Sequence, residues 1–248
     1  MAFQTKYLHT DKMHNMESPR IIVSKLLEYY SPKSVVDFGC GLGTFLKAFK
    51  EKGVLEVLGL DGEWVNKASL NNYLESNEFL EVNLETKIVF KKKYDLAISL
   101  EVAEHLSKES AALFVQNLVA ASDVILFSAA IPFQGGQNHI NEQWVKFWQD
   151  EFYKYNYVFN DLLRSELWNN EGVKWWYRQN MFIVTSKEME LKRGNISNII
   201  EIQDHIHPEH YLLKVKEHSD FRLGKSRTKE YLKLFIKSIL YNFKILKR

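Results

Sequence analysis

Two carboxylates and an imidazole stand close together in residues 101–105, whose sequence is EVAEH. Glu101, Glu104 and His105 are spaced i, i+3 and i+4, so a helix that begins here would carry all three on one face. Carboxylate oxygens beside an imidazole suit a divalent cation such as Mg²⁺ or Mn²⁺. The spacing predicts a metal site, although a helix-start acid and a packed imidazole would give these residues a structural role.

A second group of polar side chains follows a loop that the turn residues of 131–138 predict. His139 can complete the metal site as a further ligand, or it can act as a general base, because an imidazole takes up a proton near neutral pH. His105 is the second candidate for the base. Asn141 and Glu142 add hydrogen-bonding groups that suit a hydroxylated substrate.

Three closely spaced glycines, Gly39, Gly41 and Gly43, follow the apolar stretch 34–38 and precede an amphipathic one. Bare backbone lets a ligand approach closely, and the helix that begins after the loop offers unpaired N–H groups. Thr44 stands where the dinucleotide fingerprint has its third glycine, which argues against NAD. The loop predicts a nucleotide-like or carboxylate-bearing ligand, with a plain tight turn as the alternative.

Two acids accompany the glycine loop. Asp37 lies at the end of the first apolar stretch, where it would repel a pyrophosphate and attract an ammonium or a sulfonium group. Asp61 closes the second apolar stretch, where a carboxylate can accept hydrogen bonds from both hydroxyls of a ribose. Together they favour a nucleoside that carries positive charge, although Asp61 would also serve as a helix cap.

The scaffold for these residues follows from the apolar pattern of the first half of the chain, in which strands and helices alternate. Strands are predicted at 34–38, 54–61, 79–82, 94–100 and 123–128, and helices at 18–30, 45–52 and 107–121. This alternation predicts right-handed crossovers on a parallel sheet, with ligands at the carboxyl ends of the strands.

The second half of the chain is less regular. A helix is predicted at 141–152, strands at 157–167 and 181–185, and a basic amphipathic helix within 226–248, whereas 187–208 stays unassigned. We expect residues 1–190 to form the main domain and residues 191–248 to form a C-terminal extension.

The composition of the 248 residues is that of a globular protein, with 46% hydrophobic and 26% charged residues. Cys40 is the single cysteine, which excludes a disulfide scaffold and fits a reducing compartment. The chain shows neither a signal peptide nor an apolar run long enough to cross a bilayer. We therefore expect a cytoplasmic protein.

Charge is distributed unevenly along the chain. Residues 211–248 carry 11 Lys or Arg against 3 Asp or Glu, which leaves an acidic balance for residues 1–210. Nucleic acid is therefore disfavoured as a partner of the main domain. The tail can attach peripherally to the inner membrane face, pack on its own domain or contact a second subunit, and the oligomeric state stays open.

Residues 36–44, VDFGCGLGT, resemble the first motif of class I S-adenosylmethionine-dependent methyltransferases. Asp61 stands at that family's ribose-binding acid, and residues 94–101 resemble its fourth-strand motif. Over residues 20–186 the resemblance implies a Rossmann-like, doubly wound, seven-stranded α/β sheet, mostly parallel with its last strand antiparallel. The cofactor-binding residues that it implies are Asp37, Gly39, Gly41, Gly43, Asp61, Asn83, Leu84, Ser99 and Glu101.

Residues 101–105 also resemble the Glu-x-x-Glu-His element of metal-binding methyltransferases that act on hydroxyls, among them small-RNA 2'-O-methyltransferases and quinone-biosynthesis enzymes. Residues 127–144 and 175–181 resemble a bacterial subgroup with a QGG-x-x-H-x-NEQW element. An aromatic and cationic lip of Trp176, Tyr177 and Arg178 would face the methyl acceptor.

The sequence thus predicts methyl transfer from S-adenosylmethionine to an oxygen of a glycan or small metabolite, with help from Mg²⁺ or Mn²⁺. Polysaccharide biosynthesis is the expected context. An RNA 2'-O-methyltransferase and a catalytically silent, cofactor-binding subunit of a glycan-assembly complex remain the alternatives.

Overall fold

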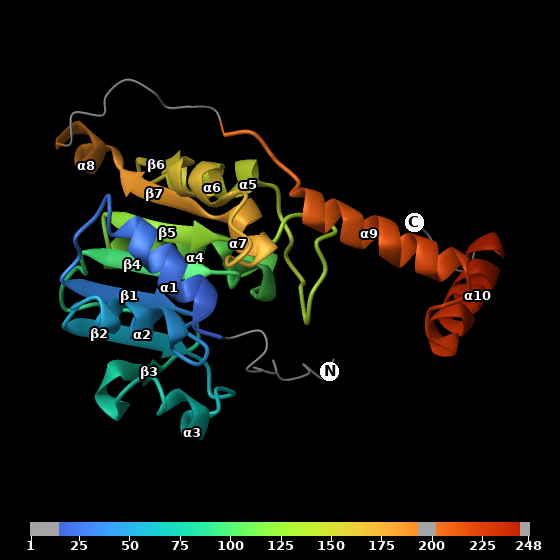
Figure 1. Ribbon diagram of the computed structural model, residues 1–248, viewed down its shortest axis with the longest axis horizontal. Helices are drawn as coiled ribbons and strands as arrows, with labels where there is room; N and C mark the ends of the chain where they lie inside the picture. The colour runs from blue at the N-terminus through green and yellow to red at the C-terminus, as the bar shows by residue number, and fades with distance from the viewer. Residues whose placement is uncertain (1–14, 193–201, 244–248) are drawn as a thin grey trace. The chain divides into compact units, whose positions relative to one another are not determined.

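A computed structural model describes residues 15–192 and 202–243, which divide into one compact unit ending at His207 and a second beginning at Pro208 (Figure 1). The first unit contains a seven-stranded sheet with the order β3-β2-β1-β4-β5-β7-β6. Its strands are β1 Ser34–Phe38, β2 Glu56–Asp61, β3 Phe79–Glu81, β4 Leu96–Leu100, β5 Val124–Ser128, β6 Tyr157–Asn160 and β7 Phe182–Ser186.

The direction of the strands agrees with the predicted sheet. Strands β1 to β5 pair in parallel, whereas β7 runs antiparallel to both β5 and β6. Strands β1 and β5 are buried along their whole length, as expected of central strands of a sheet that is covered on both faces. The order of the strands reverses between β1 and β4, so the loops after these strands border the crevice where such sheets bind ligands.

Helices cover both faces of this sheet (Figure 1). Those of the first unit are α1 Glu17–Leu26, α2 Thr44–Glu51, α3 Lys67–Leu70, α4 Ala111–Ala121, α5 Val145–Tyr153, α6 Leu162–Leu167, α7 Trp175–Asn180 and α8 Lys187–Lys192. Short 3-10 turns are η1 Ser76–Glu78, η2 Ala103–His105 and η3 Lys108–Ser110. Val35 and Val36 point to opposite faces of β1 and enter two separate hydrophobic clusters, one with Leu46 of α2 and the other with Phe114 of α4.

The predicted strand at 157–167 is wrong beyond Asn160. The side chain of Asn160 accepts a hydrogen bond from the Leu162 backbone N–H at 2.9 Å, and the chain turns there into α6. The helix predicted from residue 141 begins later, at Val145, because the preceding residues form the loop of the candidate site.

The segment 202–207 packs on the first unit. The Arg164 guanidinium donates to the Gln203 carbonyl at 3.1 Å, and the Val145 N–H donates to the Asp204 carboxylate at 3.3 Å. The segment 202–207 therefore belongs to the first compact unit, and the second compact unit begins at Pro208.

The second unit contains α9 Pro208–Arg222 and α10 Thr228–Asn242. Helix α10 lies within the predicted basic helix, whose last residues, 244–248, lie outside the described residues. Within residues 15–192 and 202–243, no helix combines the length and apolar character needed to cross a bilayer.

Candidate functional site

The loop between β1 and α2 requires glycine for reasons of conformation and packing. Gly39 and Gly43 have φ angles of +84° and +81°, which side chains of other residues rarely allow. A Cβ atom at Gly39 would overlap the side chain of Val102, and one at Gly43 would lie 2.7 Å from Leu74. Two of the three predicted glycines are therefore needed for the loop to pack on Val102 and Leu74. The contact with Val102 brings the loop close to the end of β4.

Asp61 lies beside this loop, at the end of β2, and is buried. One of its carboxylate oxygens accepts a hydrogen bond from the Gly41 N–H at 2.8 Å, and the other accepts one from the Gly62 N–H at 2.7 Å. Burial raises the pKa of Asp61, and these hydrogen bonds oppose the rise. A hydrogen bond from the Trp64 side chain also lowers this pKa, and the carboxylate keeps lone-pair capacity for a ligand hydroxyl.

The other predicted cofactor contacts lie at the ends of neighbouring strands. Asp37 is buried, and its burial together with the nearby charge of Asp61 raises its pKa well above the usual range. Ser99, in β4, is fully buried, and its hydroxyl finds no hydrogen-bond partner among the described residues. Leu84 belongs to the hydrophobic core, whereas Asn83 is exposed and caps the following turn.

Glu101 follows β4 with a left-handed φ of +56° and points into a group of amides. Its carboxylate accepts hydrogen bonds from Gln134 at 2.9 Å and from Asn180 at 3.1 Å, and Gln179 donates to both of these amides. Burial raises the pKa of Glu101 to about 7, against the opposing effect of the hydrogen bond from Asn180. Sequence reasoning missed this amide group. The available signal was the adjacent pair Gln179 and Asn180, together with Gln134 in the loop after β5.

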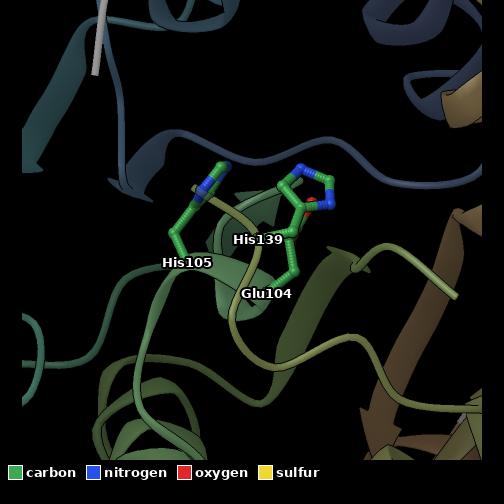
Figure 2. Close-up of side chains that lie close together, drawn as sticks. All are labelled: Glu104, His105 and His139. Atoms are coloured by element: carbon green, nitrogen blue, oxygen red, sulfur yellow. The ribbon is translucent and has the colours of Figure 1, made fainter. Parts of the chain in front are cut away.

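Glu104 and His105, two of the three residues that the spacing predicted, lie together with His139, and the possible ligand atoms of these three residues lie within 4.8 Å of one another (Figure 2). Glu101 is outside this cluster because its carboxylate is bound to the amides. Residues 103–105 form a single 3-10 turn, η2, and not the start of an α-helix.

Two backbone hydrogen bonds bring His139 to this turn. The N–H groups of Ile140 and Asn141 both donate to the Glu104 carbonyl, at 2.9 and 3.0 Å. The rings of His105 and His139 then meet edge to face, with centroids 4.9 Å apart. Asn141 is buried and donates to the Ala103 carbonyl at 3.4 Å, so it has a structural contact where a substrate contact was expected.

The electrostatics of the cluster favour uncharged side chains. Glu104 is fully buried, neither of its carboxylate oxygens has a hydrogen-bond partner among the described residues, and burial raises its pKa well above the usual range. Burial and the neighbouring His139 lower the pKa of His105 to about 4. A divalent cation would supply the missing partner of the Glu104 oxygens and would favour the ionised carboxylate. The donor set therefore fits such an ion.

Glu142 holds His139 in place. Its carboxylate lies 2.9 Å from Nδ1 of His139 and also accepts from the backbone N–H groups of Phe133 and Gly135, at 2.7 and 2.6 Å. The His139 ring packs so closely on Gly136 that a Cβ atom there would overlap it. Glu142 thus orients the imidazole and leaves Nε2 as the available nitrogen, whereas a substrate contact was expected.

The predicted lip does not form as one surface. Trp176 and Tyr177 are partly buried, and Tyr177 packs edge to face on Phe45 of α2 at 5.6 Å. Arg178 is buried and donates to the Trp168 carbonyl at 3.2 Å. The turn of α7 directs Arg178 inward, so its guanidinium is buried, whereas the rings of Trp176 and Tyr177 are partly exposed.

Comparisons with known proteins give the family. A family model described as a methyltransferase domain matches residues 14–182. Among solved structures, the methyltransferase domain of bacterial CtHen1-C is 20% identical, with a TM-score of 0.51 over 69% of this chain and 99% of that one. The plantazolicin methyltransferase BpumL is 15% identical, with a TM-score of 0.50 over 71% of this chain and 88% of that one.

The comparison with curated proteins finds no match. The two structural similarities show the fold, and the family model spans most of the chain and the whole glycine loop, with Asp61 and the histidine cluster. The chain belongs to the methyltransferase-domain family and is an S-adenosylmethionine-dependent methyltransferase with the class I fold.

Proposed function

We propose that this methyltransferase methylates a hydroxyl oxygen of a glycan or another hydroxylated small molecule, with the assistance of a divalent cation. The observation that carries the proposal is the cluster of Glu104, His105 and His139 at the carboxyl edge of the sheet. The cluster is close to the glycine loop in space, because Val102, two residues before Glu104, packs on Gly39. Imidazole and carboxylate side chains at this edge suit the removal of a proton from an alcohol.

The cofactor would be held by the residues around the glycine loop. Asp61 would accept hydrogen bonds from the ribose hydroxyls with the lone pairs that Gly41 and Gly62 leave unused. The unpartnered Ser99 hydroxyl supports a polar ligand at the end of β4. When bound, S-adenosylmethionine supplies an electrophilic methyl group on sulfur, so the protein has only to align an oxygen nucleophile and receive its proton.

His139 can serve the reaction in one of two ways. Its Nδ1 is bound to Glu142, so Nε2 either binds the cation or takes the hydroxyl proton. A cation held by Glu104 and His105 would lower the pKa of the acceptor hydroxyl. In either role Glu142 fixes the ring and stabilises positive charge on it.

The decisive experiment incubates the protein with methyl-labelled S-adenosylmethionine and a fractionated extract of its own cells, and identifies the labelled product by mass spectrometry. We expect an O-methylated glycan or metabolite, with activity that EDTA removes and Mn²⁺ or Mg²⁺ restores. A labelled nitrogen or carbon would contradict the proposed acceptor. Full activity of a metal-stripped preparation would remove the cation and leave His139 as the base.

One further candidate function has a specific observation in its favour. The Glu-x-x-Glu-His element of residues 101–105 resembles that of small-RNA 2'-O-methyltransferases, and two of its side chains lie in the cluster. The acidic balance of residues 1–210 disfavours RNA. Salt-sensitive RNA binding together with labelled RNA in the same experiment would favour this candidate, whereas cofactor binding without any labelled product would favour a silent binding subunit.

A further inference from the structure

The second compact unit carries an apolar surface that the proposed chemistry does not use. Helix α10 is amphipathic, and none of its side chains is buried. Five large apolar residues lie on one side of the helix and its last turn, at intervals of one, three and four residues. They are exposed by between 39% and 73% of their area: Leu232, Phe235, Ile236, Ile239 and Phe243. We call this set the α10 apolar face.

Positive charge lies along the border of the α10 apolar face. Lys229, Lys233 and Lys237 are spaced i, i+4 and i+8, so they form one row along the helix. Residues 208–243 carry 8 Lys or Arg against 4 Asp or Glu. The second unit therefore presents apolar and cationic side chains together, while residues 1–210 have an acidic balance.

The attachment of α10 to α9 leaves the α10 apolar face available. Tyr231 stacks on Phe221 of α9 with ring centroids 4.7 Å apart, and its hydroxyl donates to the Phe221 carbonyl at 2.7 Å. The same hydroxyl accepts from the Ser226 N–H at 3.1 Å. Gly224, with a φ of +74°, allows the sharp turn between the helices. The joint thus uses Tyr231, at the edge of the apolar face.

We propose that α10 binds the surface of an anionic lipid bilayer, with the α10 apolar face in the boundary between headgroups and acyl chains. A helix with aromatic and aliphatic residues on one side and a row of lysines beside them is the form that such binding requires. The lysines would contact lipid phosphates, and each strengthens binding about fivefold at moderate salt. The binding would be peripheral and reversible, and it goes beyond the proposed function of the first unit.

Charge favours the bilayer over a second copy of this chain. In a symmetric dimer built on the α10 apolar face, the lysine rows of the two copies would border the same interface. Like charges placed together there would repel, whereas anionic lipid would neutralise them.

The test measures sedimentation of the full-length protein with two kinds of vesicle, pure phosphatidylcholine and an equal mixture of phosphatidylcholine and phosphatidylglycerol. We expect binding to the mixed vesicles, weak binding to the neutral ones, and release by high salt. The double variant Phe235→Ser/Ile239→Ser and the triple variant Lys229→Gln/Lys233→Gln/Lys237→Gln should each bind at least about tenfold more weakly.

The matched control is Lys52→Gln/Lys87→Gln/Lys91→Gln, which removes the same charge from exposed lysines of the first unit and should bind as the wild type does. Circular dichroism of each variant shows whether its helices are retained. Unchanged vesicle binding by a folded Phe235→Ser/Ile239→Ser variant would overturn the proposal. So would a wild-type dimer, in sedimentation equilibrium, that this variant abolishes while the wild type ignores vesicles.

Discussion

Two nearby residues, Glu142 and Gly136, set the position of the His139 ring. Glu142 binds its Nδ1, and Gly136 gives the ring a surface without a side chain. Gly136 is not among the glycines with positive φ, so an alanine there introduces no backbone strain of that kind. Gly136→Ala therefore tests the position of the imidazole alone.

We expect Gly136→Ala to weaken Mn²⁺ binding about tenfold or more, because its methyl group would push the His139 ring away from Glu104 and His105. Titration calorimetry measures the affinity. The matched control is the same substitution in a His139→Ala background, where it should have little further effect. An equal loss in both backgrounds would show that the methyl group acts on something other than the ring.

At Asp61 we expect Asp61→Ala to weaken the binding of S-adenosylhomocysteine at least about tenfold, because the substitution removes the buried carboxylate that we propose as the acceptor of the ribose hydroxyls. Calorimetry with Glu81→Ala as the control separates this effect from that of a carboxylate on the neighbouring strand, since Glu81 is exposed and paired with Lys67. Unchanged affinity in Asp61→Ala would place the ribose elsewhere.

Arg164 is a buried cation in helix α6, and it contacts several other parts of the first unit. The Arg164 guanidinium is paired with Asp161, donates to the Gln179 and Gln203 carbonyls, and lies 4.6 Å from the ring of Phe182. These contacts connect α6 to α7, to β7 and to the segment 202–207. Arg164 is thus one of the contacts, with the hydrogen bond between Val145 and Asp204, that hold the segment after β7 to the first unit.

We expect Arg164→Met to lower the free energy of unfolding by about 3 kcal/mol, because two carbonyls and a carboxylate lose their donor. Urea denaturation measures the change. Arg20→Met is the matched control: Arg20 also forms a salt bridge, with Glu51, but its side chain is 56% exposed and its loss should change stability little. Equal effects of the two substitutions would contradict the role assigned to Arg164.

On the scale of the whole molecule, two partly buried groups of the site make stability depend on pH in opposite directions. The pKa of His105 is lowered from 6.5 to about 4, so its contribution is present above pH 6.5 and is lost as pH falls from 6.5 toward 4. The pKa of Glu101 is raised from 4.5 to about 7, so its contribution is present below pH 4.5 and is lost as pH rises toward 7.

We expect the metal-free wild type to lose about 2 kcal/mol of stability relative to His105→Asn between pH 6.5 and pH 5, because the unfolded chain takes up the proton that the folded site refuses. Denaturation at a series of pH values in EDTA measures this difference. Glu101→Gln is the control with the opposite sign: relative to it, the wild type should gain stability over the same range. A difference that does not vary with pH would place a charged His105 in the folded site.

The sequence was sufficient to predict the elements whose conformation depends on neighbouring residues. The apolar run of β1, the glycines after it and the acid at the end of β2 lie within 28 residues, and each has its meaning from its neighbours in sequence. The boundaries were predicted less well where side chains decide them, as at Asn160, whose hydrogen bond to the Leu162 N–H ends β6.

The sequence by itself determined the fold, the glycine loop and the candidate ligands, because apolar periodicity and residue chemistry are properties of short segments. Only the tertiary structure decided which groups meet. It bound Glu101 to Asn180, 79 residues away, and so excluded that carboxylate from the cluster. It also turned Arg178 inward, onto the Trp168 carbonyl. Such choices depend on burial and on distances between remote segments, which no local pattern contains.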